Sequence, residues 1–514
     1  MTNRRRLLTR TLSAAGLAAL ASPVGRSAAP PAGQSDLPAD ITRWTALELS
    51  SAIHSRVLSC REVLDACWQR LEALNAQFNA VVSVAPYERL AVLADERDAE
   101  LKRGNSRGWL HGMPTAPKDL ADARGFVTSS GSPLFAQQVA ATDDVHIARM
   151  RAAGALFLGK TNVPEFGLGS QTYNTVFGAT GNAFNPALTA GGSSGGAAVA
   201  LALGLVPVAD GSDFMGSLRN PAAFNNVIGF RPTPGLVPSS ERFVEELPCN
   251  GPMARTVSDA ARLLVTLAGH DPVSPTSLPV NPKAFLAPLQ RSWKGARIGW
   301  LGDFDGYLAM EPGLLAHCER ALPAFARLGC VVDAAKADYS PAELWQVWLT
   351  FRHWLTRSWG LPLYEDEAQR ALLKPELRWE IEGGAGLTAD DISHASVRRA
   401  AWYHALRQLF ESYDFLALPT TQVYPFSKTV PWPKSIDGRT MDTYHRWMEV
   451  VVPGTLSGCP VLNLSVGIDD QGLPAGIQLI APRYADFDLL AMGYAYEQAT
   501  RWNPDLRSPL LSEE

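Results

Sequence analysis

The chain has 514 residues, of which 46% are apolar and 19% charged, with a formal net charge of −5 at pH 7. This composition is typical of a globular protein with one large core or two smaller ones, and it excludes a mainly disordered chain. Residues 1–29 contain five arginines and no acidic residue, so the remainder is more acidic than the whole chain. An acidic remainder argues against nucleic acid as the main partner.

The N-terminus has the pattern of an export signal. Asn3-Arg-Arg-Arg-Leu-Leu-Thr9 resembles a twin-arginine motif, and the uncharged run that follows over 11–21 is too short to span a bilayer. We expect a signal peptide over 1–29, a linker over 30–40 and a periplasmic or secreted protein without stable membrane insertion. The alternative is a basic tail on a cytoplasmic protein.

Helices and short strands are predicted to alternate along the rest of the chain. Thr45-x-x-Glu48 and Ser59-x-x-Glu62 are capping boxes that begin two helices, and further helices are expected near Pro86 and over 142–153. Short apolar runs predict strands near 113–117, 155–159, 205–209, 297–301 and 415–419. This alternation favours an α/β sheet with helices on both faces.

Residues 154–161 match the phosphate-loop pattern GxxxxGK[ST] only in letters. The pattern requires a strand before the loop and a helix after it, whereas here a helix precedes and Ala-Leu-Phe-Leu reads as a strand. We therefore expect no nucleotide site. No histidine or cysteine cluster has metal-ligand spacing, so neither a metal nor a cofactor is expected.

One lysine and two serines in glycine-rich turns form a candidate acyl-transfer site. Lys118 follows an apolar run, Ser193 lies in the GGSSGG turn over 191–196, and Ser217 ends the turn over 211–217. A serine nucleophile needs a base, and a lysine can be that base only if burial lowers its pKa from about 10.4. Each feature alone also fits ordinary structure, namely a surface lysine, a capped helix and an N-cap serine.

The turn before Ser217 could also bind an oxyanion. A strand is expected over 205–209 and a helix from 217, so Ser217 would lie near a helix N-terminus. We expect the oxyanion to be held by the backbone N–H groups of Phe214, Met215, Gly216 and Ser217. Losing one such donor typically costs about 3–4 kcal/mol of transition-state stabilisation.

The order and spacing of these residues resemble the amidase signature family. Gly159-Lys-Thr-Asn162, Glu165-Phe166, Phe177-Gly178 and Asn185-Pro186 lead into the GGSSGG turn, and Ser193 and Ser217 have the family's spacing. The resemblance is strong over 105–255, clear again over 453–497 and weak between about 285 and 445.

The resemblance implies an amidase domain over 41–510, with a signature core at about 105–255, a substrate-shaping region at about 285–445 and a mixed central sheet. It implies hydrolysis of a carboxamide to an acid plus ammonia or an amine. Ser217 matches the nucleophile, Ser193 the proton relay that follows a cis peptide bond, and Lys118 the general base and acid. The positions that would support the site are matched by Ser194, Asp213 and Arg219.

Two positions depart from the family pattern. Met215 stands where glycine is usual, so either this position is not left-handed or the oxyanion donors are re-aimed; its side chain could also narrow the acyl pocket. Pro117 replaces a common aliphatic residue but leaves the Lys118 side chain free.

Ten of the fourteen tryptophans lie between Trp293 and Trp447, where the resemblance is weak. Trp345, Trp348 and Trp359 fall on helical stretches and indicate either core packing or an aromatic wall that favours an apolar or aromatic amide. A small-molecule amide is the expected partner, and a homodimer is left open.

Two rival functions are also left open. One is a glutamine-hydrolysing subunit of a tRNA-dependent amidotransferase. The other is an α/β-hydrolase-like esterase, because 191–195 also fits the GxSxG elbow. The histidines that would complete its Ser-His-Asp triad are His270, His317, His353, His394, His404 and His445. No disulfide is expected to be essential among Cys60, Cys67, Cys249, Cys318, Cys330 and Cys459.

Overall fold

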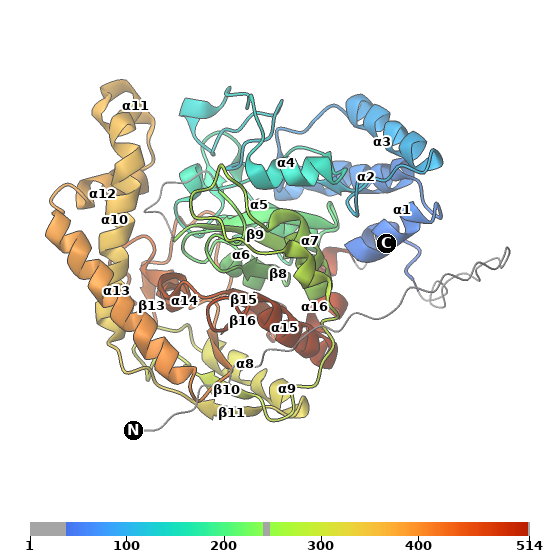
Figure 1. Ribbon diagram of the computed structural model, residues 1–514. Helices are drawn as coiled ribbons and strands as arrows, with labels where there is room; N and C mark the ends of the chain where they lie inside the picture. The colour runs from blue at the N-terminus through green and yellow to red at the C-terminus, as the bar shows by residue number, and fades with distance from the viewer. Residues whose placement is uncertain (1–36, 240–246, 512–514) are drawn as a thin grey trace. The chain divides into compact units, whose positions relative to one another are not determined.

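The computed structural model describes residues 37–239 and 247–511. The expected signal peptide, 1–29, and most of the expected linker lie outside these residues. The compact unit that carries the site begins at Asp40, and Figure 1 shows its helices arranged around a central sheet. No helix in the described part of the chain is both long and apolar enough to cross a bilayer.

The central sheet has eight strands in the order β11-β10-β12-β16-β15-β8-β9-β7. β10 runs parallel to both of its neighbours and all other pairs are antiparallel, so the sheet is mixed, as expected. The bounds are β7 Val208–Asp213, β8 Ile228–Arg231, β9 Cys249–Ala254, β10 Arg297–Trp300, β11 Val331–Ala334, β12 Phe415–Pro419, β15 Val461–Ile468 and β16 Pro474–Ile480.

Side chains of β15 show that helices cover both faces of this sheet. A Cβ atom on Gly493 of α15 would meet Leu462 and Leu464, whereas a Cβ atom on Gly476 of β16 would meet Asn463 and a side chain of α6. Successive residues of a strand point to opposite faces, so α15 (Asp486–Thr500) and α6 (Arg219–Phe224) lie on opposite sides. This confirms the expected α/β fold.

Helices occur in every part of the described chain, and Figure 1 shows them around the sheet. Both predicted capping boxes are complete, with the Thr45 and Ser59 hydroxyls accepting from the backbone N–H groups of Glu48 and Glu62. The remaining helices are α1 Ala46–His54, α2 Cys60–Phe78, α3 Tyr87–Lys102, α4 Val145–Ala152, α5 Gly195–Ala202, α7 Val257–Leu267, α8 Leu314–Glu319, α9 Leu322–Arg327, α10 Pro341–Glu365, α11 Glu367–Leu372, α12 Pro375–Gly383, α13 Ala389–Leu409, α14 Val452–Ser457 and α16 Trp502–Asp505.

Two predicted strands do not join the central sheet. The segments near 113–117 and 155–159 form only a short parallel pair, β2 (Pro114–Thr115) with β3 (Leu156–Phe157). Pro114 and Pro117 lack the N–H group that a longer ladder requires. Instead, the Thr115 hydroxyl donates a hydrogen bond of 2.8 Å to the carbonyl of Val208, so a side chain ties this segment to β7.

The strand expected over 205–209 begins later, at Val208. The N–H groups of Leu205 and Val206 still bond to the carbonyl of Ala200 at the end of α5, and Pro207 has no N–H to donate. The strand extends to Asp213 and leads directly into the turn that carries Ser217.

A second apolar cluster forms where the tryptophan-rich region meets the sheet. It contains the buried side chains of Trp345, Trp348, Trp402 and Trp447. Trp345 and Trp348 of α10 and Trp402 of α13 therefore pack in a core that also contains Met215 and Phe224, next to the serine turn.

Candidate active site

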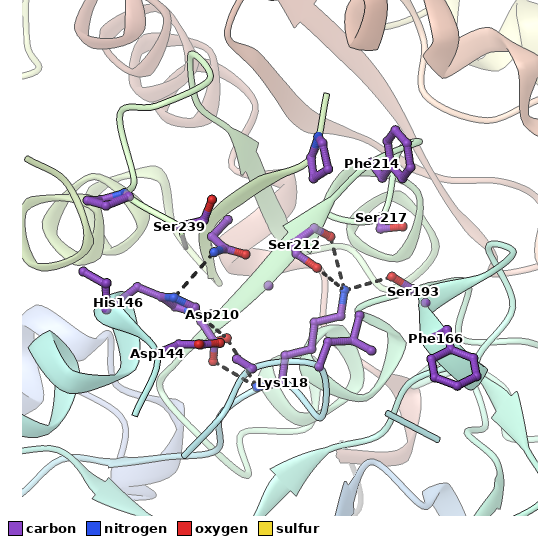
Figure 2. Close-up of a pocket in the computed structure, with 18 of the residues that line it drawn as sticks. Lys118, Asp144, His146, Phe166, Ser193, Asp210, Ser212, Phe214, Ser217 and Ser239 are labelled. Carbon is purple, nitrogen blue, oxygen red and sulfur yellow. Dashed lines mark hydrogen bonds and ion pairs between the residues drawn. The ribbon is translucent and has the colours of Figure 1, made fainter. Parts of the chain in front are cut away.

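A cavity of about 250 Å³ brings together the predicted lysine and both serines. Lys118 follows β2, Ser193 precedes α5, and Ser217 lies between β7 and α6. Figure 2 shows the Lys118 side chain extending toward Ser193, with Ser217 on the same side of the cavity. Residues far apart in the chain therefore converge as the sequence predicts.

Three oxygen atoms surround the amine of Lys118. Its Nζ lies 2.8 Å from Ser193 Oγ, 2.9 Å from Ser212 Oγ and 3.2 Å from the Ser212 carbonyl. At the other end of the residue, the backbone N–H of Lys118 donates to the carboxylate of Asp210. Both ends of the lysine are thus fixed by β7.

Burial sets the protonation state of this amine. Lys118 is 1% exposed, and desolvation lowers its pKa from 10.5 to about 7, although Asp210 and Asp213 act in the opposite direction. The carboxylate of the adjacent Asp119 is held elsewhere, because it accepts from Ser129 and lies 3.8 Å from the amine of Lys160. A lysine with a pKa near 7 is partly neutral at neutral pH and can accept a proton.

Lys160, the lysine of the false phosphate-loop match, has a structural role. Its side chain is fully buried and donates to the Ala121 carbonyl and the Thr128 hydroxyl. A strand, β4 (Lys160–Thr161), takes the place where a phosphate loop would begin a helix. The expectation that this segment is no nucleotide site agrees with the structure.

The two serine turns are joined by backbone contacts. The peptide bond between Gly192 and Ser193 is cis, as the family resemblance implied. The N–H of Ser194 donates to the carbonyl of Ser217 at 3.2 Å, and the Ser194 hydroxyl donates to the carbonyl of Ser212. The structure describes no hydrogen bond between the Ser193 and Ser217 hydroxyls; they face the same cavity without touching.

Asp213 organises the turn that carries the predicted oxyanion donors. Its carboxylate accepts from the N–H groups of Gly216 and Leu218 and forms a bidentate ion pair with Arg219, with both N–O distances 3.0 Å. Burial alone would raise the pKa of Asp213, but the guanidinium groups of Arg219 and Arg231 hold it well below its usual range. The carboxylate therefore stays ionised and fixes the turn.

This arrangement revises the expected set of oxyanion donors. The Gly216 N–H is occupied by Asp213, whereas the N–H groups of Phe214, Met215 and Ser217 have no acceptor in the described chain. The helix expected from 217 begins at Arg219 and has only six residues, so it adds little dipole to the site.

Met215 does not affect the cavity in the way that the sequence suggested. The left-handed residue of the turn is Gly216, with φ of 79°, and Met215 is not in that region. The Met215 side chain packs in the second apolar cluster and does not line the cavity. The departure from the family pattern is therefore accommodated without backbone strain.

Sequence reasoning missed the residues that hold the lysine and the turn. Ser212 and Asp210 contact Lys118, and Arg231 donates to the backbone carbonyl of Asp213. A signal was present for the first two: residues 210 and 212 share a face of any strand that leads into the serine turn. No comparable signal marked Arg231, which comes from β8, a strand that β9 separates from β7 in the sheet.

Aromatic side chains form one wall of the cavity. Phe166 and Phe214 line it, and each is backed by a tryptophan, with ring centroids 5.3 Å apart for Phe166–Trp359 and 5.4 Å for Phe214–Trp348. No tryptophan among the described residues lines the cavity itself: Trp348 is a buried core residue that packs behind Phe214.

The histidine-based alternative has no support in the geometry. None of the six downstream histidines lines the cavity that Ser193 and Ser217 share. The one histidine that does is His146, whose Nε2 lies 3.5 Å from Asp210 on the side away from Ser217 (Figure 2). Among the described residues no group of histidine, cysteine or acidic side chains could hold a metal, and all six cysteines are buried free thiols.

Comparisons with known proteins agree with this geometry. The family model Amidase matches residues 62–490. An acylamidase of Rhodococcus erythropolis is 32% identical over 469 residues, covering 89% of this chain and 96% of that protein. A glutamyl-tRNA(Gln) amidotransferase subunit of Acidothermus cellulolyticus is also 32% identical, over 90% of this chain and 95% of its own length.

Solved structures show the same fold. A bacterial aryl acylamidase of the amidase signature family superposes with a TM-score of 0.84 at 30% identity, covering 91% of this chain and 98% of its own. A 6-aminohexanoate cyclic dimer hydrolase in complex with its substrate superposes with a TM-score of 0.79 at 25% identity, over 91% and 99% of the two chains. This chain therefore belongs to the amidase signature family and hydrolyses amide carbon–nitrogen bonds.

Proposed function

We propose that Ser217 is the nucleophile of this hydrolysis, with Ser193 as proton relay and Lys118 as general base. The observation that carries the proposal is the 2.8 Å contact of Ser193 with the buried amine of Lys118, whose pKa is lowered to about 7, in a cavity that Ser217 also lines. Ser217 Oγ attacks the amide carbon as its proton passes to Ser193, whose own proton passes to Lys118 Nζ.

The intermediate then places its negative charge on the former carbonyl oxygen. The unoccupied N–H groups of Phe214, Met215 and Ser217 are the donors available to it. The C–N bond breaks as the Lys118 ammonium returns a proton through Ser193 to the leaving nitrogen. Water then attacks the acyl-enzyme with Lys118 again as base, releasing the acid and restoring Ser217.

We further propose an apolar or aromatic amide as substrate, because Phe166 and Phe214 form the wall of a small cavity. The similar aryl acylamidase carries a name that fits such a substrate. The similarity to glutamyl-tRNA(Gln) amidotransferase subunits favours a second candidate, hydrolysis of glutamine within a partner complex. Ammonia release from glutamine and from aryl amides by the purified single chain separates the two.

Export is proposed from residues 1–29 alone. A reporter fused to residues 1–35 should reach the periplasm, and replacing Arg5 and Arg6 by lysine should retain it in the cytoplasm. Whether the enzyme is a homodimer is a separate question that the mass in solution answers.

The roles of the three residues can be tested directly. Ser217→Ala should lose at least about a thousandfold in kcat, since the covalent intermediate cannot form. Ser239→Ala is the matched control, because Ser239 lines the same cavity without touching Lys118 or Ser193. With hydroxylamine present, the wild type should yield a hydroxamate from the acyl-enzyme, and mass spectrometry should place the acyl group on Ser217. Acylation of another residue would overturn the assignment.

A further inference from the structure

Arg352 brings a cation to the aromatic wall of the cavity. It lies in α10, in the region where the sequence carried little family signal, and lines the cavity together with Ser217 and Phe214. The residue is only 5% exposed. Its guanidinium carbon stands 4.7 Å from the centre of the Phe214 ring, so its position relative to the serine turn is defined.

Two buried residues fix the orientation of this guanidinium. Arg352 Nε donates to Glu380 Oε1 at 3.0 Å, and Nη2 donates to the hydroxyl of Tyr444 at 3.0 Å. The Tyr444 hydroxyl in turn donates to Glu380 Oε1 at 2.5 Å. Burial alone would raise the pKa of Glu380, but Arg352 and neighbouring histidines lower it to about 2, so the carboxylate is ionised.

One edge of the guanidinium remains available. Nε is occupied by Glu380 of α12 and one hydrogen of Nη2 by Tyr444, whereas Nη1 has no acceptor among the described residues and is not one of the fully buried atoms without a partner. Nη1 and the second hydrogen of Nη2 form the end of the fork, a geometry that matches two oxygen atoms of one carboxylate. The free N–H groups of Arg352 at the cavity wall therefore favour a ligand that supplies a hydrogen-bond acceptor.

The carboxyl groups of the cavity lie on its opposite side. Asp144 and Asp210 group together there, while Phe214 and Ser217 lie across from them (Figure 2). Carboxyl groups on that side disfavour a ligand carboxylate, and the cation of Arg352 favours it beside Phe214. The cavity thus distinguishes its two ends by charge.

We propose that Arg352 is a substrate-binding residue that pairs with a carboxylate on the substrate, so that the preferred amides carry a carboxylate besides the scissile group. The apolar body of the substrate lies against Phe214 and Phe166, and Arg352 takes its charged end. This inference rests on the proposed placement of the reaction at Ser217 and adds a substrate class to it.

The test compares amides that differ only in charge. Glutaramate and terephthalamate each carry a carboxylate, and replacing that carboxylate by a methyl ketone gives a neutral partner of similar shape. In the wild type we expect kcat/KM to be at least about tenfold higher for the charged member of one pair. Equal values within both pairs would overturn the proposal while leaving amide hydrolysis at Ser217 intact.

The residue is tested with a variant that leaves no unpaired buried charge. Arg352→Met alone strands the Glu380 carboxylate, so the decisive protein is the double variant Arg352→Met/Glu380→Gln, which keeps an acceptor for Tyr444. Its preference for the charged amide should fall about tenfold or more, whatever happens to the absolute rate. Arg291→Met, at an exposed arginine, is the matched control and should keep the wild-type preference. An unchanged ratio in the double variant would overturn the role of Arg352.

A binding measurement decides the matter even if turnover is slow. Glutarate and terephthalate should bind to the Ser217→Ala protein. Their binding should be lost when Arg352→Met and Glu380→Gln are introduced into the same chain. Failure of both dianions to bind to Ser217→Ala would contradict the proposal. Failure of the wild type to form any acyl-enzyme, with carboxylate binding intact, would instead contradict the proposed function.

Discussion

Replacing the buried lysine by methionine should stabilise the protein while abolishing its activity. The pKa of Lys118 falls from 10.5 to about 7 through burial, and each unit of such a shift corresponds to about 1.4 kcal/mol. At pH 7 the folded state is therefore destabilised by about 4 kcal/mol relative to a neutral side chain. Methionine has a similar size and no charge, but it cannot make the hydrogen bonds to Ser193 and Ser212. The loss of these bonds cancels about 1–2 kcal/mol of the stabilisation. The net gain for Lys118→Met is about 2–3 kcal/mol at pH 7.

The pH dependence of this gain identifies its cause. Between the folded pKa near 7 and the unfolded pKa of 10.5, the unfolded wild type binds one more proton than the folded state, so wild-type stability rises with pH. The advantage of Lys118→Met should thus shrink by about 1.4 kcal/mol per pH unit and vanish at about pH 9. Chemical denaturation of both proteins at several pH values measures it. Lys283→Met, at an exposed lysine, should show no such trend.

Two outcomes would refute this reasoning. A Lys118→Met protein less stable than the wild type at about pH 7 would mean that the contacts with Ser193 and Ser212 outweigh desolvation. A stability difference that does not change with pH would mean that the lysine is not neutralised on folding.

Other predictions follow from the same electrostatics. The kcat/KM of the wild type should rise with pH and level off above about pH 7, because only neutral Lys118 accepts a proton; a profile that falls through this range would contradict the base assignment. Asp213→Asn should cost about 3–5 kcal/mol in unfolding free energy by leaving Arg219 and Arg231 unpaired, and should lower kcat by loosening the turn. An Asp213→Asn protein with wild-type stability and kcat would show that the turn is held by other contacts.

The sequence predicted those parts of the fold and site that depend on local pattern. Capping boxes gave the starts of α1 and α2, because the side chains that cap a helix lie within the first turn. Ser193 and Ser217 could be proposed from the sequence because glycine-rich turns and their spacing are visible in the chain itself, and Lys118 because its position matches the family pattern. Apolar runs predicted β10 and β12 within a residue or so.

What the sequence could not predict depends on contacts between distant segments. The segment near Pro114 looks like a sheet strand, but its prolines limit the ladder and Thr115 bonds to β7 through its side chain. Arg231 and Asp213 lie on different strands, so their pairing appears only in the folded chain. Likewise Arg352 reaches the cavity because α10 packs against α12, in a region where no motif indicates the partner of either helix.

The site lowers the pKa of a lysine although two carboxylates lie close enough to raise it. Asp210 and Asp213 both favour the ammonium form of Lys118, yet desolvation outweighs them. The pKa of Lys118 therefore also depends on Arg219 and Arg231, which form ion pairs with Asp213. Their positive charges reduce the field that the Asp213 carboxylate exerts on the lysine. The Asp213 carboxylate also fixes the turn of the proposed oxyanion donors through Gly216 and Leu218. One buried cluster therefore both fixes the proposed donors and allows the proposed base to lose its proton near pH 7, so replacing Arg219 by an uncharged residue should raise the pH at which activity levels off.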